Sequence, residues 1–154
     1  LDAIGVYVQG LTKKVGPCGG AGGSAKDMDL TGVTRITKLG IRYGEAIDAI
    51  TVSFERNGST QSTDLWGGNG GSLTEINLKS DEYITYVSGY AGNLGDLFIV
   101  RSLQFITNLA SYGPYGVSEG TPFGFSALDG QIIGFHARSG TYLDAIGVYI
   151  QATR

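Results

Sequence analysis

The chain has 154 residues, the size of one domain, and its 42% apolar and 16% charged residues are typical of a folded protein rather than a disordered one. A single cysteine, Cys18, excludes a disulfide within the chain, and a single histidine, His136, excludes zinc sites built on a histidine pair. The net charge of −3 argues against non-specific binding to nucleic acid or to an anionic membrane surface, and no apolar run approaches the roughly 18 residues of a membrane-spanning helix.

Short β-strands are the regular elements that the sequence pattern predicts. β-Branched and aromatic residues dominate, or alternate with polar ones, in five segments: 47–54, 82–87, 97–105, 131–135 and 145–150. No long window keeps a 3.6-residue period, and 26 glycines are too many for helices at a cost of about 1 kcal/mol each. We therefore expect an all-β domain, which excludes nucleotide-binding folds that place a helix after a glycine-rich turn.

Internal repetition divides the chain into three units. Glycine-rich turns recur at 16–24, 66–72 and 112–121, and Gly23, Gly71 and Gly120 are 48 and 49 residues apart. Segment 47–52 resembles segment 143–148 at an offset of 96, which is twice 48. A unit of about 48 residues holds about four strands, the size of one Greek key. The repeat predicts three small sheets around a pseudo-threefold axis.

A second repeat concerns the first residues. Segment 1–9 differs from segment 143–151 only in having Val8 where the later copy has Ile150. We interpret residues 1–10 as a strand resembling the last strand of a preceding repeat, followed by a domain over residues 11–152. A permuted or extended single domain is the alternative.

Several motifs together resemble the jacalin-related lectin family. They span residues 15 to 151 and comprise segments 16–23, 66–71, 87–90, 101–105, 112–116, 120–123 and 140–149. The resemblance implies a β-prism of type I, made of three Greek-key four-stranded sheets, and a carbohydrate-binding function. Cys18 departs from the tryptophan often found at that turn, a position that shapes packing.

The family's sugar signature, Gly-x-x-x-Asp, is present here from Gly140 to Asp144. An ionised carboxylate can accept hydrogen bonds from two neighbouring sugar hydroxyls, and the backbone N–H groups of Thr141 and Tyr142 lie in the same turn. Gly23 can bring its backbone close to a sugar, and Tyr142 adds an apolar face. The resemblance implies a first sugar site built from Gly23, Gly140, Thr141, Tyr142 and Asp144. The pattern alone also fits a turn-capping aspartate.

A second Gly-x-x-x-Asp runs from Gly44 to Asp48. Some mannose-binding members of the family carry two sites per domain, and the resemblance implies a second site formed by Gly44, Glu45, Ala46, Asp48 and Gly71. An ordinary hairpin turn is the alternative.

The third unit carries no such site in our interpretation. Arg101 aligns with Asp144, and a guanidinium cannot accept hydrogen bonds. Segment 92–96 matches the Gly-x-x-x-Asp pattern but lies out of register, and we expect the loop 89–96 to border the first site.

The sugar class follows from the resemblance. In the galactose-binding branch the chain is cut at the first glycine turn, whereas segment 22–25 here is continuous, which implies the mannose/glucose branch. The resemblance to that branch implies a cytoplasmic or nuclear protein, and a secreted or vacuolar protein is the alternative. We expect glycan partners, no nucleic acid, no cofactor and no metal, and a homo-oligomer or tandem-domain protein. An enzyme is not expected, because no nucleophile-elbow motif is present and His136 is expected to face solvent. A protein-interaction module that has lost sugar binding is the remaining alternative.

Overall fold

A computed structural model describes residues 12–152, and all of its regular elements are strands. The predicted all-β class is confirmed. Within this range no helix is long and apolar enough to cross a membrane. The proposed strand over residues 1–10 lies outside the described residues and stays a prediction.

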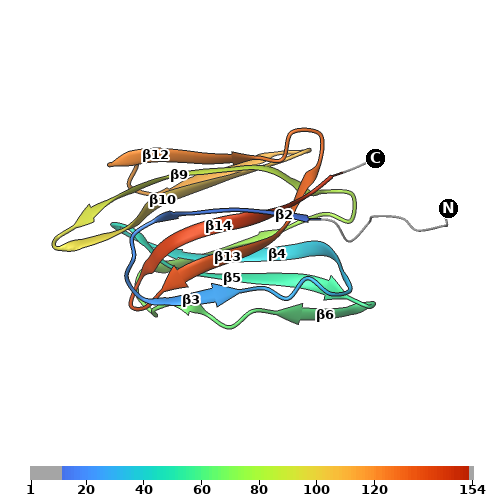
Figure 1. The fold of residues 1–154 in the computed structure, drawn as a ribbon, viewed down its shortest axis with the longest axis horizontal. Coiled ribbons are helices and arrows are strands. Elements are labelled where there is room, and N and C mark those ends of the chain that lie inside the picture. Colours follow the sequence, from blue (N-terminus) through green and yellow to red (C-terminus); the bar gives the residue numbers. More distant parts are fainter. Residues whose placement is uncertain (1–11, 153–154) are drawn as a thin grey trace.

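The strands form three antiparallel groups, called lower, upper and middle here (Figure 1). The upper and middle groups are joined by one bridge, between Ile84 and Ile132, into an eight-stranded sheet, and the lower group is a five-stranded sheet. The lower group runs β6-β5-β4-β8, with β7 beside β5: β4 (Val33–Tyr43), β5 (Ile47–Arg56), β6 (Ser59–Ser62), β7 (Trp66–Gly67) and β8 (Ser72–Asn77). The upper group runs β11-β10-β9-β12: β9 (Ile84–Leu94), β10 (Leu97–Thr107), β11 (Ser111–Gly116) and β12 (Thr121–Ser126). The middle group runs β2-β14-β13-β3: β2 (Thr12–Gly19), β3 (Ser24–Asp27), β13 (Gln131–Ser139) and β14 (Leu143–Gln151).

Five of these strands were predicted from the sequence pattern. β5, β9, β10, β13 and β14 contain the predicted segments, and most of them run several residues further. One boundary differs, because β9 begins at Ile84 and not at residue 82. Glu82 lies instead in the preceding turn, where its buried carboxylate accepts a hydrogen bond from the backbone N–H of Lys79 at 3.0 Å.

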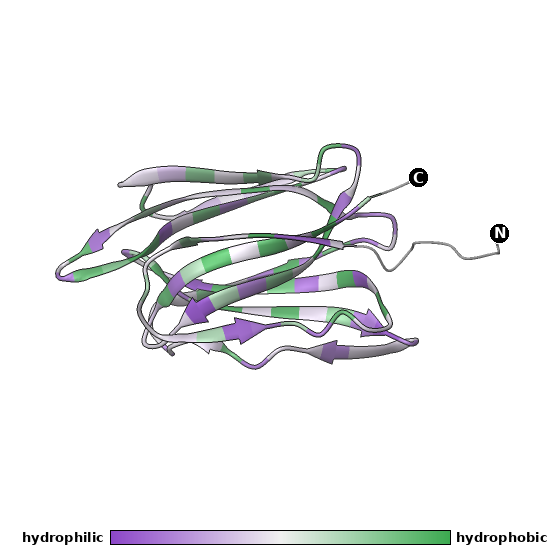
Figure 2. Ribbon diagram, viewed as in Figure 1, coloured by the Kyte–Doolittle hydropathy of each residue, from purple (hydrophilic) through white to green (hydrophobic). Residues whose placement is uncertain are grey.

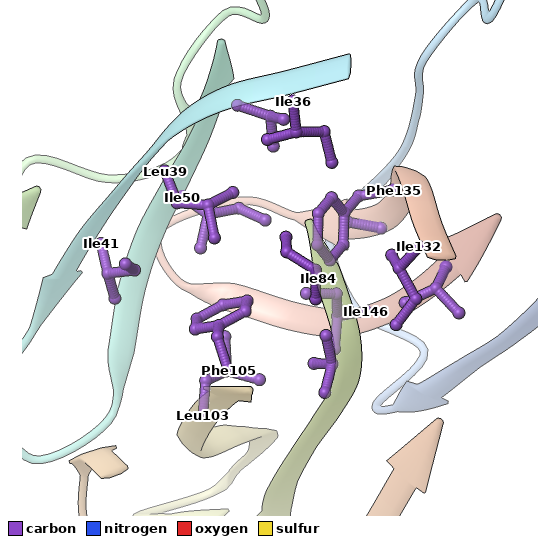
Figure 3. Close-up of a cluster of buried hydrophobic side chains, with 14 of the residues drawn as sticks. Ile36, Leu39, Ile41, Ile50, Ile84, Leu103, Phe105, Ile132, Phe135 and Ile146 are labelled. Carbon is purple, nitrogen blue, oxygen red and sulfur yellow. The ribbon is translucent and has the colours of Figure 1, made fainter. Parts of the chain in front are cut away.

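One hydrophobic core fills the space between the three groups. Hydrophobic and hydrophilic residues alternate along several strands, so that one face of each points inward (Figure 2). Figure 3 shows how side chains from all three groups converge, among them Ile41, Ile84, Leu103, Phe105 and Phe135, each at most 1% exposed. The core side chains of each group therefore pack against those of the other two.

Backbone geometry repeats three times at one end of the prism. The carbonyl oxygens of Asp144, Asp48 and Arg101 accept hydrogen bonds at 2.8, 2.9 and 3.0 Å from Gly20, Gly68 and Val117 respectively. The hairpin turns β4–β5, β9–β10 and β13–β14 lie at this end, on the left in Figure 1. The two predicted sites therefore share one end of the molecule.

Candidate functional site

The first candidate site surrounds the carboxylate of Asp144, the second residue of β14. Asp144 is only 8% exposed, and the glycine turn between β2 and β3 lies directly against it. A methyl group on Gly22 would lie 2.6 Å from Oδ2 of Asp144, and one on Gly23 would lie 2.7 Å from Oδ1. Gly23 also has a φ of +68°, a conformation that favours glycine. The turn can approach the carboxylate this closely only because neither residue has a side chain.

Arg138 on β13 holds this glycine turn in place. Its Nε donates a hydrogen bond to the carbonyl of Gly22 at 3.0 Å, and its Nη2 donates one to the carbonyl of Gly23 at 2.8 Å. Two donors on one planar guanidinium fix both the position and the tilt of the turn. Arg138 therefore positions the turn and supplies a positive charge near Asp144.

The second candidate site repeats this arrangement on β4 and β5. Asp48 is 9% exposed, and methyl groups on Gly70 and Gly71 would lie 2.5 Å from its Oδ2 and 2.6 Å from its Oδ1. Arg42 donates from Nε to the carbonyl of Gly70 at 2.9 Å and from Nη2 to that of Gly71 at 3.2 Å. Both predicted sites therefore bring a carboxylate, a glycine pair and an arginine together.

Burial gives the two carboxylates the same electrostatic character. Desolvation raises the pKa of Asp144, opposed by Arg138 and by the backbone amides of Gly140 and Asp144 itself. Desolvation also raises the pKa of Asp48, opposed by Arg42. No side chain within residues 12–152 donates a hydrogen bond to either carboxylate. Each carboxylate can therefore accept hydrogen bonds from a ligand.

The first glycine of each signature is not required by the fold. A methyl group on Gly44 would meet nothing within 4 Å, and one on Gly140 would make only ordinary contacts, 3.5 Å or more from any atom. Neither residue has a positive φ. These positions border open space beside the carboxylates, which is where a ligand could approach the backbone.

The two sites differ in the residues between glycine and aspartate. Tyr142 is half-buried in the first site, whereas its counterpart in the second, Ala46, is only 1% exposed. Thr141 and Glu45 are both exposed, so the second site has an additional carboxylate where the first has a hydroxyl. The predicted apolar face is thus a feature of the first site alone.

The third unit has Arg101 in the place of the aspartate, as the alignment predicted. Its backbone makes the equivalent hydrogen bond, and its side chain is 8% exposed. The aspartate of segment 92–96 lies out of register, as expected, although its glycine does not. A methyl group on Gly92 would lie 3.1 Å from Cα of Gly120, as one on Gly140 would lie 3.5 Å from Cα of Gly23, so Gly92 is the equivalent glycine. Five extra residues then separate it from Arg101, and Asp96 lies at the hairpin tip.

The expected loop 89–96 is also mostly strand. Strand β9 continues to Leu94, and only Gly95 and Asp96 form the turn to β10. The contact with the first glycine turn comes from β10 just beyond this segment, since a methyl group on Gly20 would lie 1.9 Å from the carbonyl oxygen of Phe98, and the prediction that residues 89–96 border the first site stays a prediction. This segment is strand because β9 and β10 pair along it as far as Leu94, which pairs with Leu97.

His136 does not face solvent, which corrects the sequence-based expectation. It is 4% exposed on β13, its Nε2 lies 2.8 Å from the carbonyl oxygen of Val15, and its ring packs edge-on against Tyr149. Desolvation lowers its pKa and favours the neutral ring. Within residues 12–152, no group of three or more His, Cys, Asp or Glu residues is arranged to hold a metal ion.

Sequence reasoning missed the two arginines and the first glycine of each pair. Arg42 and Arg138 each precede the signature glycine by two residues, so Arg-x-Gly-x-x-x-Asp occurs twice at an offset of 96. Gly22 and Gly70 are likewise 48 residues apart. Extending the repeat alignment to these columns would have found all four.

Comparison with known proteins places this geometry in context. The family model of the Jacalin-like lectin domain matches residues 15–149. The chain is 43% identical over 145 residues to Jacalin-related lectin 19 of Arabidopsis thaliana, covering 91% of this chain and 81% of that protein. It is 35% identical over 162 aligned positions to the mannose/glucose-specific lectin of Parkia pendula, covering 98% of this chain and 35% of that protein.

A solved structure shows the same fold. The chain superposes on AcmJRL, a mannose-binding jacalin-related lectin from Ananas comosus, with a TM-score of 0.88 and 39% identity, covering 92% of this chain and 99% of that one. Its similarity extends over almost the whole described domain.

Proposed function

Because this chain belongs to the jacalin-like lectin family and is a carbohydrate-binding domain, we propose that it binds mannose- and glucose-type residues at two sites, one at Asp144 and one at Asp48. One observation carries the proposal. Each aspartate is a buried carboxylate that receives no hydrogen bond from a side chain of residues 12–152, and each faces a glycine pair held by an arginine. An ionised carboxylate with free acceptor positions can accept hydrogen bonds from two neighbouring sugar hydroxyls.

The chemistry of binding follows from the groups present. The carboxylate accepts two hydroxyl hydrogen bonds, each contributing on the order of 1.5–3 kcal/mol because the acceptor is charged. Arg138 and Arg42 favour the ionised form by their positive charge. The open side of Gly140 and Gly44 lets a sugar ring approach the backbone. In the first site Tyr142 offers its ring to the apolar face of the sugar.

The named properties of relatives support the sugar class. The Ananas comosus lectin is described as mannose binding and the Parkia pendula lectin as mannose/glucose specific. No enzymatic step is part of the proposal, since the family consists of lectins. We expect binding to be independent of metal, because neither Asp144 nor the pair Asp48 and Glu45 belongs to a group of three or more His, Cys, Asp or Glu residues within residues 12–152 that could hold a metal ion.

Calorimetric titration with methyl α-mannoside tests the proposal. Wild type should bind two molecules per chain, and Asp144→Ala and Asp48→Ala should each bind one. Affinity should be about millimolar per site, because shallow polar sites bury little area. A chelator should leave the titration unchanged.

Three results would contradict parts of this proposal. If Asp48→Ala still binds two molecules, the second signature is only a hairpin turn. If galactose competes better than mannose, the proposed sugar class is wrong. If the chelator abolishes binding, the proposed metal independence is wrong.

Weak individual sites imply that useful binding comes from several sites acting together. We propose that the chain acts as an oligomer or as part of a tandem-domain protein. The Parkia pendula relative, of which this chain covers 35%, is an example of a longer lectin. Light scattering on the protein gives its oligomeric state directly.

A further inference from the structure

The third unit contains a charged pair at the positions that form sugar sites in the other two units. Arg101 takes the place of the aspartate, and Glu119 takes the place of Gly22 and Gly70, one residue before Gly120, the counterpart of Gly23 and Gly71. Nη1 of Arg101 lies 3.7 Å from Oε1 of Glu119. The side chain of Arg101 is buried, whereas that of Glu119 is 71% exposed, so the weak pair does not by itself explain the buried arginine.

The other hydrogen bonds of Arg101 cross to the second site. Its Nε donates to the carbonyl oxygen of Glu45 at 3.0 Å, and its Nη1 donates to the carbonyl oxygen of Asn93 at 2.7 Å. Glu45 lies inside the signature of the second site, between Gly44 and Asp48. The guanidinium thus joins the β4–β5 turn to the end of β9.

The first site shows why the second needs such a contact. There the carbonyl of Thr141, the counterpart of Glu45, packs against the neighbouring unit at Gly68, where an added methyl group would lie 2.4 Å away. The counterpart of Gly68 in the third unit is Val117, whose backbone makes the equivalent hydrogen bond. Valine has a side chain where Gly68 has none. The carbonyl of Glu45 is instead bound by Arg101.

We infer that Arg101 is a positioning residue for the second sugar site: the third unit has exchanged its own ligand-binding carboxylate for a guanidinium that holds the Glu45 turn in its binding conformation. The inference rests on the proposed function for its effect on sugar, but the clamp itself is a property of the free protein. Fixing a loop in its bound conformation raises affinity because the ordering cost is met before the ligand arrives. The polar partners of the Arg101 side chain among residues 12–152 are Glu45, Asn93 and Glu119, none of which belongs to the first site's signature, 140–144.

Two measurements on Arg101→Met test the inference, because methionine fills similar space without a donor. In the sugar-free protein, hydrogen exchange of the Gly44 amide should accelerate, while that of its counterpart Gly140 should not change. The Gly44 amide donates a hydrogen bond to the carbonyl of Ala46, and the Gly140 amide donates one to the carbonyl of Tyr142, both at 3.0 Å, so the two amides form a matched pair. In an NMR titration with methyl α-mannoside, the amides of residues 44–48 should report affinity weakened about tenfold, the effect of losing one charged hydrogen bond. Those of residues 140–144 should report no change.

Two further variants keep the test decisive. Arg101→Lys retains the charge but replaces a planar fork by one ammonium group, so it should give an intermediate effect at the second site. Glu119→Gln removes only the exposed partner and should leave both sites as in wild type. If Arg101→Met does not fold, the comparison of Arg101→Lys with Glu119→Gln still separates a clamp from a surface ion pair.

The outcomes that overturn the inference differ from those that overturn the proposed function. Equal exchange at Gly44 in wild type and both Arg101 variants, or equal weakening at both sites, would show that Arg101 positions nothing specific. If wild-type residues 44–48 do not respond to sugar, the second site of the proposed function fails, and the exchange measurement alone still decides the clamp.

Discussion

Gly22 and Gly70 are the residues whose substitution most directly separates the two sites. A methyl group on Gly22 would lie 2.6 Å from Oδ2 of Asp144, and one on Gly70 would lie 2.5 Å from Oδ2 of Asp48. Neither has a positive φ, so alanine is excluded by the carboxylate and not by backbone strain. Gly22→Ala should therefore abolish the first site and Gly70→Ala the second, each reducing the calorimetric stoichiometry from two to one.

Each of these variants serves as the control for the other. Both add one methyl group to an exposed turn, so differences in general stability cancel between them. Two sites of unchanged affinity in both variants would show that the carboxylates are not the ligand-binding groups.

The raised pKa of both aspartates predicts how sugar binding depends on pH. Binding needs the ionised carboxylate, and desolvation raises the pKa of Asp144 and Asp48 above the ordinary value of about 3.9. As the pH falls, affinity for methyl α-mannoside should therefore decline while ordinary surface aspartates are still ionised. Calorimetry between pH 7 and 4, with circular dichroism to verify the fold, measures this. Affinity that stays constant down to pH 4 would contradict it.

The raised pKa of Asp144 also predicts a pH effect on folding stability, opposite in sign to the effect on sugar binding. A carboxyl group whose pKa is higher in the folded than in the unfolded protein lowers the stability as the pH rises from the unfolded through the folded pKa, because its charge is poorly solvated in the folded state. Asp144→Asn removes that charge. It should lose sugar binding at the first site without lowering the melting temperature at pH 7. A clear loss of stability would show that Asp144 has a structural role.

The ligand-facing residues were predicted from sequence, whereas the supporting arginines were not: the repeat marks their positions, but it does not show what they do. Asp144, Asp48, Gly23 and Gly71 belong to a repeated pattern with a known chemical use. Arg138 acts through two backbone carbonyls, and nothing in a sequence shows which carbonyls a surface arginine reaches.

Glu82, a buried carboxylate outside the two sugar sites, joins elements of the upper group. Glu82 is 3% exposed and accepts hydrogen bonds at 2.6 Å from both Thr107 on β10 and Tyr112 on β11, besides the Lys79 amide. These hydrogen bonds outweigh desolvation and lower the pKa of Glu82, while they raise that of Tyr112 to about 12. Glu82 thereby ties the turn before β9 to β10 and β11.

Glu82→Gln should destabilise the domain by about 1–3 kcal/mol, because an amide cannot accept the same charged hydrogen bonds. Since the folded pKa is lowered, the contribution of Glu82 is complete above the unfolded value of about 4.3 and is lost as the pH falls through the folded pKa. Urea unfolding at pH 7 and at pH 3 measures both effects. The difference between wild type and variant should shrink at pH 3; a constant difference would assign the loss to packing.

Strand positions were predicted more reliably than strand ends. The central strands β5, β9, β10, β13 and β14 carry dense β-branched and aromatic residues, which mark them in any sequence. Strand β3 (Ser24–Asp27) carries no such pattern, and it exists because residues 136–139 offer it a pairing edge. Likewise the polar pattern of 89–96 resembles a loop, but pairing with β10 extends β9 to Leu94. His136 was misplaced for the same reason, since β2 and Tyr149 cover it.

At the scale of the whole molecule, one Greek-key unit occurs three times and is used in two ways. The first and second sites keep the aspartate, the glycine pair and the arginine, whereas the third unit replaces the aspartate by Arg101 and has Tyr90 where the others have arginine. The repeat spacing alone predicted the threefold architecture. It could not predict that the third unit would contact the second site, because that contact depends on which units are neighbours in space.

Both sites lie at one end of the prism, which predicts how the domain responds to ligand density. The carbonyl of Thr141 in the first site packs against Gly68, next to the second site's glycine turn, so the two sites are adjacent. A surface dense in mannose can engage both at once, and linked binding of this kind strengthens retention by about 100-fold or more. Wild type should therefore leave a densely mannosylated surface far more slowly than either Asp144→Ala or Asp48→Ala.

The comparison at low density supplies the control. On a sparsely mannosylated surface a single domain reaches only one sugar, so the three proteins should dissociate at similar rates. Light scattering on the same samples shows whether the variants share the oligomeric state of wild type, which keeps the number of domains constant in the comparison. If wild type and the single-site variants dissociate equally from the dense surface, the two sites do not act together, and adjacency at one end of the prism contributes nothing to avidity.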